Sequence, residues 1–497
     1  MLTFGDMLGL WLLLPALGGL FCLVLPTARA VLNTVVAGVA GVAGLGLACA
    51  WAALARGPLF GAGQWLHLDA LSAVHAAVML AVFAISSLFA RVYFLAGPPG
   101  HALTLIEARR FGALWFGSLA AMTLVLLSNN LGILWVGVET TTLVTAFLIC
   151  LHKTPESLEA TWKYLIVCSV GVAFAFMGIL LFGAAASTAA SASASFLHWT
   201  HLRTLASSLD PRLVKLAFVF LLVGYGAKAG LAPMHSWLPD AHSQAPAPVS
   251  ALFSGFLLNA ALYALMRFLP LVKAAAGPAW ASGLLVIFGV ISVLVAAVFI
   301  LSQHDLKRLL AYCSVEHLGF MALGLGLGPA GAFAALWHMM NHSAAKALGF
   351  FCAGRLGQLD GTHDLRRLAG AGRAHPLWGY GLFAALLALI GLVPFALFWS
   401  EFFILRAAVD ARRYVALGLV LFGAAAAFVG ILGRALDLAW GRDARPARSG
   451  PVPKSGVLEH AVVLVPLAFL LLLGLWLPEP LAAALRAAAA VVEGAGP

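Results

Sequence analysis

The chain has 497 residues, of which 63% are hydrophobic and only 10% are charged. Soluble domains carry about 25% charged residues, so the composition excludes a soluble protein and predicts a polytopic membrane protein. The net charge of +10 could suggest nucleic-acid binding, but basic loops on the cytoplasmic side of a membrane account for it better.

The predicted elements are all α-helical. A span needs roughly 20 apolar residues, and about fourteen runs of that kind occur. They cover residues 7–25, 31–54, 71–94, 112–128, 131–151, 164–184, 214–232, 248–269, 280–301, 309–327, 330–352, 377–397, 414–439 and 458–478. The first run has no Lys or Arg before its apolar core, which is wrong for a cleaved signal peptide, so it is expected to be a retained helix. The connecting loops are short, so residues 1–497 are expected to form one membrane domain.

The basic residues predict an orientation for this helical array. Successive loops lie on opposite sides of the membrane. The loops on the side that holds both termini, which include Arg267, carry fewer Lys and Arg residues than the loops on the other side. The more basic side faces the cytoplasm by the positive-inside rule. The sequence therefore predicts a multi-pass protein of a bacterial cytoplasmic membrane with both termini in the periplasm.

Several ionisable residues lie inside the apolar runs. Glu139, Lys228 and Lys346 are deep within them, and Glu401 follows a run broken by proline. A lysine at the bilayer centre costs about 2.5–3.5 kcal/mol on insertion scales, so these side chains should face the bundle interior and find partners or water. An ion pair between Glu139 and Lys228 that only fixes helix packing is one interpretation. A chain of groups that passes protons across the membrane is the other.

Histidines accompany these charges. His338, His342 and Lys346 are spaced four residues apart and share one face of a helix. His-x-x-x-His can bind zinc, but the ammonium on the same face, with no acid or thiol nearby in the sequence, favours a hydrated polar stripe over a metal site. Glu316 and His317 add two more ionisable groups in the run 309–327.

Two runs are expected to be broken helices, because Pro233 follows Lys228 closely and Pro394 closely precedes Glu401. Broken helices at matching places in two halves are typical of transporters with inverted repeats. The predicted layout has N-terminal helices in 1–111, five-helix repeats in 112–269 and 280–439, and a last helix at 458–478.

Four stretches carry a family resemblance. GYGAKAGLAPMHSWLPDAHSQAPAPVSALFSG (224–255) resembles the signature of the antiporter-like subunits of respiratory complex I, a superfamily that includes Mrp-type cation/proton antiporters and the membrane arms of group 4 hydrogenases. QHDLKRLLAYCSVEHLGFM (303–321) resembles its second signature. EATWKYLI (159–166) and GLVPFALFWSEFFIL (391–405) most resemble the F-type membrane subunits of hydrogenase-4.

The resemblance implies a fourteen-helix core in which helices 7 and 12 are broken. It also implies that Glu139 pairs with Lys228, that Lys228 is the central proton carrier and that Glu401 is the terminal acid. Relatives often carry lysine or histidine where this chain has Asn259, which can hold water but carries no charge. The candidate proton-translocation residues are Glu139, Lys228, His235, Asn259, His317, His338, His342, Lys346 and Glu401.

No cofactor is expected on this chain. Its six cysteines are scattered without a Cys-x-x-Cys pair, and neither a Walker lysine motif nor a dinucleotide glycine fingerprint occurs. The predicted function is a proton-translocating membrane subunit of a redox-driven complex of the hydrogenase-4, formate hydrogenlyase or complex I kind. Its partners would be further membrane subunits and peripheral iron–sulfur, nickel–iron or quinone-reactive subunits. The alternatives are a subunit of an Mrp-type Na⁺(K⁺)/H⁺ antiporter and a membrane scaffold, for example for inorganic carbon uptake.

Overall fold

The structure, a computed structural model, describes residues 3–95, 102–189, 197–442 and 455–495. Within these ranges the first half of the chain forms α1 (Phe4–Cys22), α2 (Ala28–Arg56), α3 (Ala70–Leu95), α4 (Leu105–Leu127), α5 (Leu131–Ile149), α6 (Pro155–Ala189), α7 (Trp199–Leu205), α8 (Pro211–Ala229), α9 (Trp237–Gln244), α10 (Ala247–Leu252) and α11 (Leu258–Ala276). The second half forms α12 (Pro278–Ser302), α13 (Leu306–Leu325), α14 (Pro329–Asp360), α15 (Ala371–Ala374), α16 (Pro376–Leu389), α17 (Ala396–Asp410), α18 (Tyr414–Trp440), α19 (Val457–Leu475) and α20 (Glu479–Glu493).

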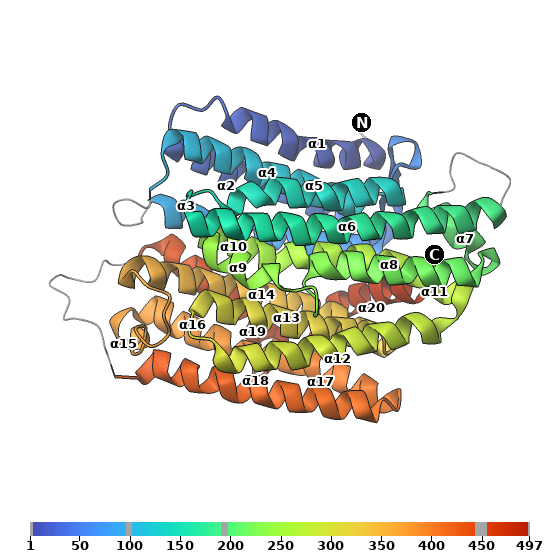
Figure 1. Ribbon diagram of the computed structural model, residues 1–497. Coiled ribbons are helices and arrows are strands. Elements are labelled where there is room, and N and C mark those ends of the chain that lie inside the picture. The colour runs from blue at the N-terminus through green and yellow to red at the C-terminus, as the bar shows by residue number, and fades with distance from the viewer. Residues whose placement is uncertain (1–2, 96–101, 190–196, 443–454, 496–497) are drawn as a thin grey trace.

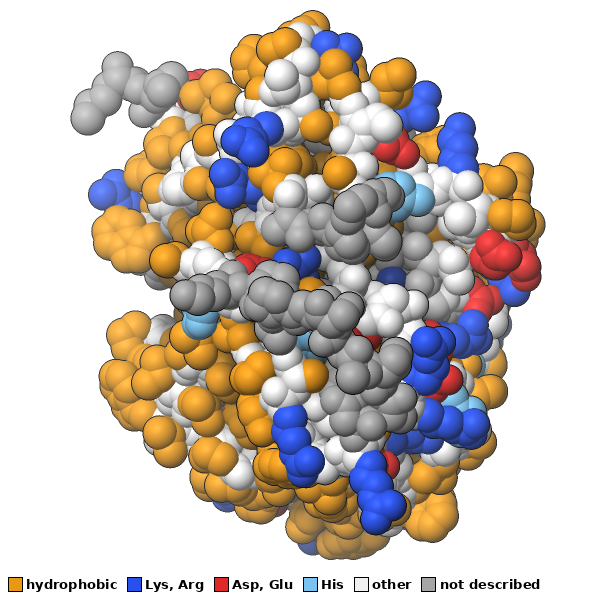
Figure 2. Space-filling view, turned by 90° about the vertical axis from the view of Figure 1, so that its left-hand side faces the viewer, with side chains coloured by type: hydrophobic (Ala, Val, Ile, Leu, Met, Phe, Trp, Pro, Cys, Tyr) orange, Lys and Arg blue, Asp and Glu red, His pale blue; other side chains and the backbone are white. Residues whose placement is uncertain are grey.

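The long helices run side by side as one bundle (Figure 1). A short antiparallel hairpin, β1 (Leu59–Gly61) and β2 (Leu66–Leu68), joins α2 to α3. The labelled N and C ends both lie toward the right-hand end of the bundle in Figure 1. Figure 2 looks onto the opposite end, where Lys and Arg side chains gather, while hydrophobic side chains occupy much of the outline. A charged end beside a hydrophobic outline is expected of a helical bundle that is embedded in lipid and exposes this end to water.

The prediction of a helical polytopic membrane protein is confirmed, although the short hairpin of β1 and β2 departs from the expectation that every element is a helix. Among the described residues, ten helices are long and apolar enough to cross a membrane. The count of about fourteen spans stays a prediction, because the runs 214–232, 309–327, 330–352 and 377–397 fall on helices outside these ten. Helices α8, α13 and α14 carry buried lysines or histidines, which make them less apolar, whereas α16 is apolar but only 14 residues long because the chain breaks after it.

Two interruptions occur where the sequence predicts them. The chain leaves helical geometry between α8 and α9, around Pro233, and again between α16 and α17, around Pro394. Inside a membrane the freed backbone groups need partners from protein or water. The N–H of Ala232 donates to the hydroxyl of Ser292 at 3.0 Å, and the carbonyl of Ala396 accepts from the amide of Asn341 at 3.0 Å. Both breaks are therefore held by polar side chains of neighbouring helices.

The end of the chain differs from the prediction. The last predicted helix, 458–478, ends in the structure at Leu475 as α19, and a further helix, α20, covers Glu479–Glu493. Pro478 cannot continue the hydrogen-bond ladder of α19, but it is well placed to begin a new helix. Helix α20 packs against α3, α14 and α11, and Lys273 pairs with Glu493 at 2.7 Å.

Small residues bring the site-bearing helices close together. Gly224 of α8 lies against the backbone of Gly171 and Ala175 of α6, and Gly289 of α12 lies against Gly319 of α13. A Cβ at these positions would collide with the facing backbone. Close approach through small residues is the usual way in which membrane helices pack, because lipid supplies no hydrophobic drive between them. The contact between α6 and α8 positions Lys228 against the polar residues of α5 and α6.

Candidate functional site

Lys228 lies in the last turn of α8 and is buried. Its ammonium donates to the hydroxyls of Thr142, in α5, at 2.8 Å and of Tyr164, in α6, at 2.7 Å. The hydroxyl of Thr145 lies 2.7 Å from that of Tyr164. The charge is thus solvated by protein hydroxyls, which meets the requirement that an ionisable group in a membrane find polar partners.

Glu139 lies one helical turn before Thr142 and is half-buried. One carboxylate oxygen accepts from Ser169 at 2.7 Å, and the other accepts from Thr142 at 3.5 Å. The ion pairs of the described residues do not include one between Glu139 and Lys228, so the direct pair that the family resemblance implies is not formed here. The hydroxyl of Thr142 stands between the two charges because it contacts both.

Helix α14 supplies the second group of ionisable residues. His338, His342 and Lys346 are all buried on it, as the four-residue spacing predicts. The ammonium of Lys346 donates to the carbonyl of Leu310 at 2.6 Å. Neither ring nitrogen of His342 has a hydrogen-bond partner among the described residues.

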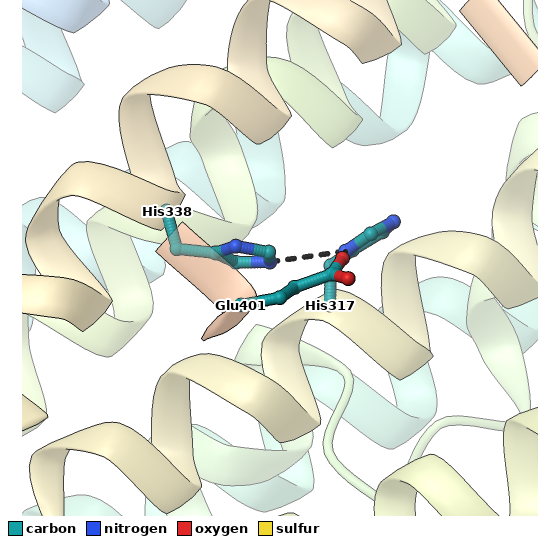
Figure 3. Close-up of side chains that lie close together, drawn as sticks. All are labelled: His317, His338 and Glu401. Atoms are coloured by element: carbon teal, nitrogen blue, oxygen red, sulfur yellow. Dashed lines mark hydrogen bonds and ion pairs between the residues drawn. The ribbon is translucent and has the colours of Figure 1, made fainter. Parts of the chain in front are cut away.

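Three side chains from three helices meet next to this face (Figure 3). Nδ1 of His317, in α13, lies 3.0 Å from Nε2 of His338 and 3.7 Å from a carboxylate oxygen of Glu401, in α17. One ligand atom from each residue lies within 4.8 Å of the other two. Both imidazoles are buried, and the Glu401 side chain is 16% exposed. We call these three residues the His–His–Glu cluster.

The second interruption positions this cluster. The hydroxyl of Ser400 lies 2.9 Å from Nδ1 of His338 and holds that ring from behind. Gly391, between α16 and α17, has a φ of 64° and passes so close to the Glu401 carboxylate that a Cβ there would collide with it. Glycine is the residue that adopts this conformation readily. The interruption around Pro394 therefore makes room for a carboxylate next to two imidazoles.

The remaining candidates are dispersed. Asn259, at the start of α11, donates to the hydroxyl of Ser343 at 3.2 Å and to the carbonyl of Gly255 at 2.9 Å. His235, between α8 and α9, lies beside the rings of Phe299 and Tyr312, and no hydrogen bond joins it to another candidate among the described residues. The structure thus forms two groups of candidates, one around Lys228 and one around the His–His–Glu cluster, and leaves His235 and Asn259 outside both.

Sequence reasoning missed the hydroxyls and His242. Thr142 and Ser400 carry no signal of their own, because a Ser or Thr hydroxyl in a membrane helix commonly bonds a carbonyl of its own helix. Tyr164 carries none because a tyrosine in an apolar run is common and its partner lies on another helix. His242 is buried in α9, stacks on the ring of Phe350 and lies close enough to His342 for their charges to interact. The sequence feature that could have identified His242 was its position in the motif that follows Pro233.

A buried ion pair at the other end of α11 was also missed. Arg267, assigned to a loop by the charge count, is buried and donates to both carboxylate oxygens of Asp69 at 2.6 and 2.8 Å. Burial alone would raise the pKa of Asp69, but the charge and hydrogen bonds of Arg267 outweigh it and hold that pKa well below its usual value. This bidentate pair ties the segment between β2 and α3 to α11.

Comparison with known proteins now defines the class. Residues 128–427 match the family described as "NADH:quinone oxidoreductase/Mrp antiporter, TM", and the chain belongs to this family. It is a multi-pass, antiporter-like membrane subunit of the complex I and hydrogenase-4 type.

Particular relatives cover most of the chain. It is 40% identical over 358 residues to the hydrogenase-4 component F homolog of Methylacidiphilum infernorum, covering 71% of this chain and 75% of that protein. Among solved structures, the membrane-bound sulfane sulfur reductase, an archaeal respiratory membrane complex, contains a chain with a TM-score of 0.85 and 25% identity over 98% of both chains. The Mrp complex of Dietzia sp. DQ12-45-1b contains one with a TM-score of 0.84 over 100% of both chains, and its 21% identity shows the shared fold alone.

Proposed function

We propose that this chain carries protons across the membrane as a subunit of a redox-driven complex most like a hydrogenase-4. The observation that carries the proposal is the pair of buried polar groups that spans α5, α8, α14 and α17. Buried charges in a membrane are costly and mark ion pathways unless they serve packing alone. Lys228, which is solvated by hydroxyls, and the His–His–Glu cluster both offer exchangeable protons. An ion pair that served only to fix helix packing would require neither the hydroxyls around Lys228 nor the cluster.

The proposed path begins at Glu139 and ends at Glu401. Movement of Lys228 toward or away from Thr142 changes how strongly its positive charge is stabilised by Glu139, and this change drives proton uptake or release. Lys346, His342 and the His–His–Glu cluster then receive the proton.

The unpartnered polar atoms support a hydrated interior. His342, one nitrogen of His317, one oxygen of Glu316 and the amide oxygen of Asn259 are buried without a protein partner among the described residues. Buried polar atoms of this kind are normally satisfied by ordered water. Water in these places would join the side chains into a path for protons, including at Asn259, which cannot itself carry charge.

Partner subunits would complete the assembly. Glu139 is half-buried on α5, and hydrophobic residues of α5 and of the neighbouring α6, such as Leu143 and Ile166, are exposed. A carboxylate at membrane depth is stable against protein or water but not against lipid. We therefore propose that a neighbouring membrane protein of the complex covers this face and that peripheral subunits carry the redox centres.

The chain would lie in the cytoplasmic membrane with both termini in the periplasm, and its two broken helices would mark the inverted repeats 112–269 and 280–439.

Replacement of the central lysine tests the proposal. The complex is purified with Lys228→Met, reconstituted into vesicles and driven by its electron donor while a pH-sensitive dye reports proton movement. Lys215→Met, on the same helix but near its start, is the matched control. We expect the first variant to assemble and lose proton translocation while the second retains it. Unchanged translocation with Lys228→Met in an intact complex would remove the assignment.

Mrp-type exchange is the alternative, and the family description includes it. The same vesicles without an electron donor decide between the two. Proton movement that depends on an imposed Na⁺ or K⁺ gradient would favour exchange, whereas movement that depends on the electron donor favours a redox-driven complex.

A further inference from the structure

We propose that the His–His–Glu cluster, His317, His338 and Glu401, is a binding site for Zn²⁺, and that the bound ion stops proton transfer. The second half of this statement rests on the function proposed above, whereas the binding itself does not. The inference starts from the convergence in Figure 3, where two imidazoles and one carboxylate from three different helices point toward one another.

The geometry is close to that of a tetrahedral zinc site. With metal–ligand bonds of about 2.0–2.1 Å, neighbouring ligand atoms in a tetrahedron lie about 3.3 Å apart. In the structure the two imidazole nitrogens are 3.0 Å apart, and the carboxylate oxygen is 3.7 Å from Nδ1 of His317. All three ligand atoms lie within 4.8 Å of one another, so the proposed site needs the side chains to rotate until each atom reaches bonding distance of one ion.

The donor chemistry also fits. Two histidines and one carboxylate are a ligand set used by zinc enzymes that keep a fourth position open for water. Histidines that bind zinc usually hold their other ring nitrogen in a hydrogen bond, which fixes the ring. Nδ1 of His338 has such a contact with the Ser400 hydroxyl at 2.9 Å.

The structure answers the objection that the sequence raised. On the sequence, His338 and His342 had a lysine on the same face and no nearby acid. The fold replaces His342 with His317 as the second imidazole and supplies Glu401 from α17 as the acid. Lys346 still lies near enough to His317 for its charge to act, so it lowers the affinity for a cation, while the carboxylate of Glu316 near Lys346 offsets part of that charge.

Binding and proton transfer exclude one another at this place. A nitrogen or oxygen that coordinates zinc must be deprotonated, so the bound ion occupies the atoms that would otherwise receive a proton. Zinc is expected to inhibit at one saturable site.

Metal binding by the purified full-length chain, without redox turnover, is the test. Zn²⁺ is titrated calorimetrically, and Co²⁺ is used as a spectroscopic probe of tetrahedral coordination. The variants are His338→Gln, Glu401→Gln and Ser400→Ala, and the control is His460→Gln, which removes an exposed histidine on α19. We expect the wild type and the control to bind one more equivalent than His338→Gln or Glu401→Gln. Ser400→Ala keeps all three ligands and should bind about 10-fold more weakly.

The outcomes are distinct. Equal stoichiometry and affinity in wild type, His338→Gln and Ser400→Ala, or loss of binding only with His460→Gln, would show surface binding and overturn the site. If the His338 variant does not fold, the folded Ser400 variant decides by its affinity alone. If the protein does not bind zinc, the zinc site is rejected and the proposed proton path is unaffected. If the protein binds zinc at this site but the Lys228→Met variant still translocates protons, the proposed proton path is rejected and the zinc site is retained.

Discussion

The hydroxyl of Thr142 links Glu139 to Lys228, and Thr142→Val is the sharpest test of that link. The two contacts in series measure 2.8 and 3.5 Å. The charges are therefore at most about 6 Å apart, and at an effective dielectric constant of about 20 they attract by about 3 kcal/mol. Moving one charge against 100 mV requires about 2.3 kcal/mol. Closing the separation to about 3 Å would roughly double this attraction, so formation of the direct pair can supply the energy of a proton step.

Valine keeps the branched shape of threonine but removes the hydroxyl. A hydrogen bond to a charged group contributes about 1.5–3 kcal/mol, which corresponds to roughly a ten- to hundredfold change in an equilibrium constant. We expect Thr142→Val to slow donor-driven proton translocation by about tenfold or more. Tyr164 still accepts from Lys228 in this variant, so the protein should fold and assemble.

Thr140→Val is the matched control for this experiment. Its hydroxyl donates to the carbonyl of Val136 in the same helix, and no hydrogen bond among the described residues joins it to an ionisable side chain. Dye-monitored proton uptake in vesicles is measured for both variants at equal protein and equal electron transfer. Wild-type rates with Thr142→Val, alongside an inactive Lys228→Met, would refute the relay through this hydroxyl.

Two further variants test the framework around the site. Asp69→Ala should lower the free energy of unfolding in detergent by about 3–5 kcal/mol, because it leaves a buried guanidinium unpaired; Arg486→Ala, in an exposed pair, should cost less than about 1 kcal/mol. Since the folded pKa of Asp69 is depressed, its contribution should be present above about pH 4 and be lost only as the pH falls further. Gly391→Val should displace the Glu401 carboxylate and reduce proton translocation, and Gly418→Val, whose Cβ meets open space, should not. Thermal unfolding and vesicle assays report these effects, and a Gly391 variant with the wild-type rate would contradict the positioning argument.

The helical bundle could be predicted because membrane composition leaves few options for the backbone. Every backbone polar group in lipid needs an internal partner, so long apolar runs become helices. The breaks around Pro233 and Pro394 were predictable for a related reason, since proline removes a donor and the neighbouring polar residues mark where that loss is tolerated. The continuation into α20 was not predicted, because its alanine-rich sequence follows Pro478 and is only 15 residues long, which is shorter than a membrane span.

Of the candidate site, only the charged residues could be predicted from the sequence, and the contacts between them could not. An ionisable residue in an apolar run stands out, so Lys228 and Glu401 were found. Contacts between helices are set by packing, and nothing in the local sequence states that Thr142 reaches Lys228 or that Glu401 meets His317. Arg267 shows the opposite error, because a charge near the end of a run was read as a loop residue although it pairs inside the protein with Asp69.

The two polar groups are separate in this conformation, and that separation bears on how transfer could be controlled. Among the described residues, no hydrogen bond joins the Lys228 group to the His–His–Glu cluster or to His242. The ring of Phe253 instead lies 6.1 Å from that of Tyr164 and 6.2 Å from that of His242. Phe253 begins a π-helical turn between α10 and α11, and such turns are frequent at functional sites. On the proposed path, we expect this apolar ring to block water between the two groups, as hydrophobic constrictions do in channels. We therefore expect a proton on Lys228 to wait until this turn moves, which would prevent a passive leak and would couple proton transfer to a conformational change.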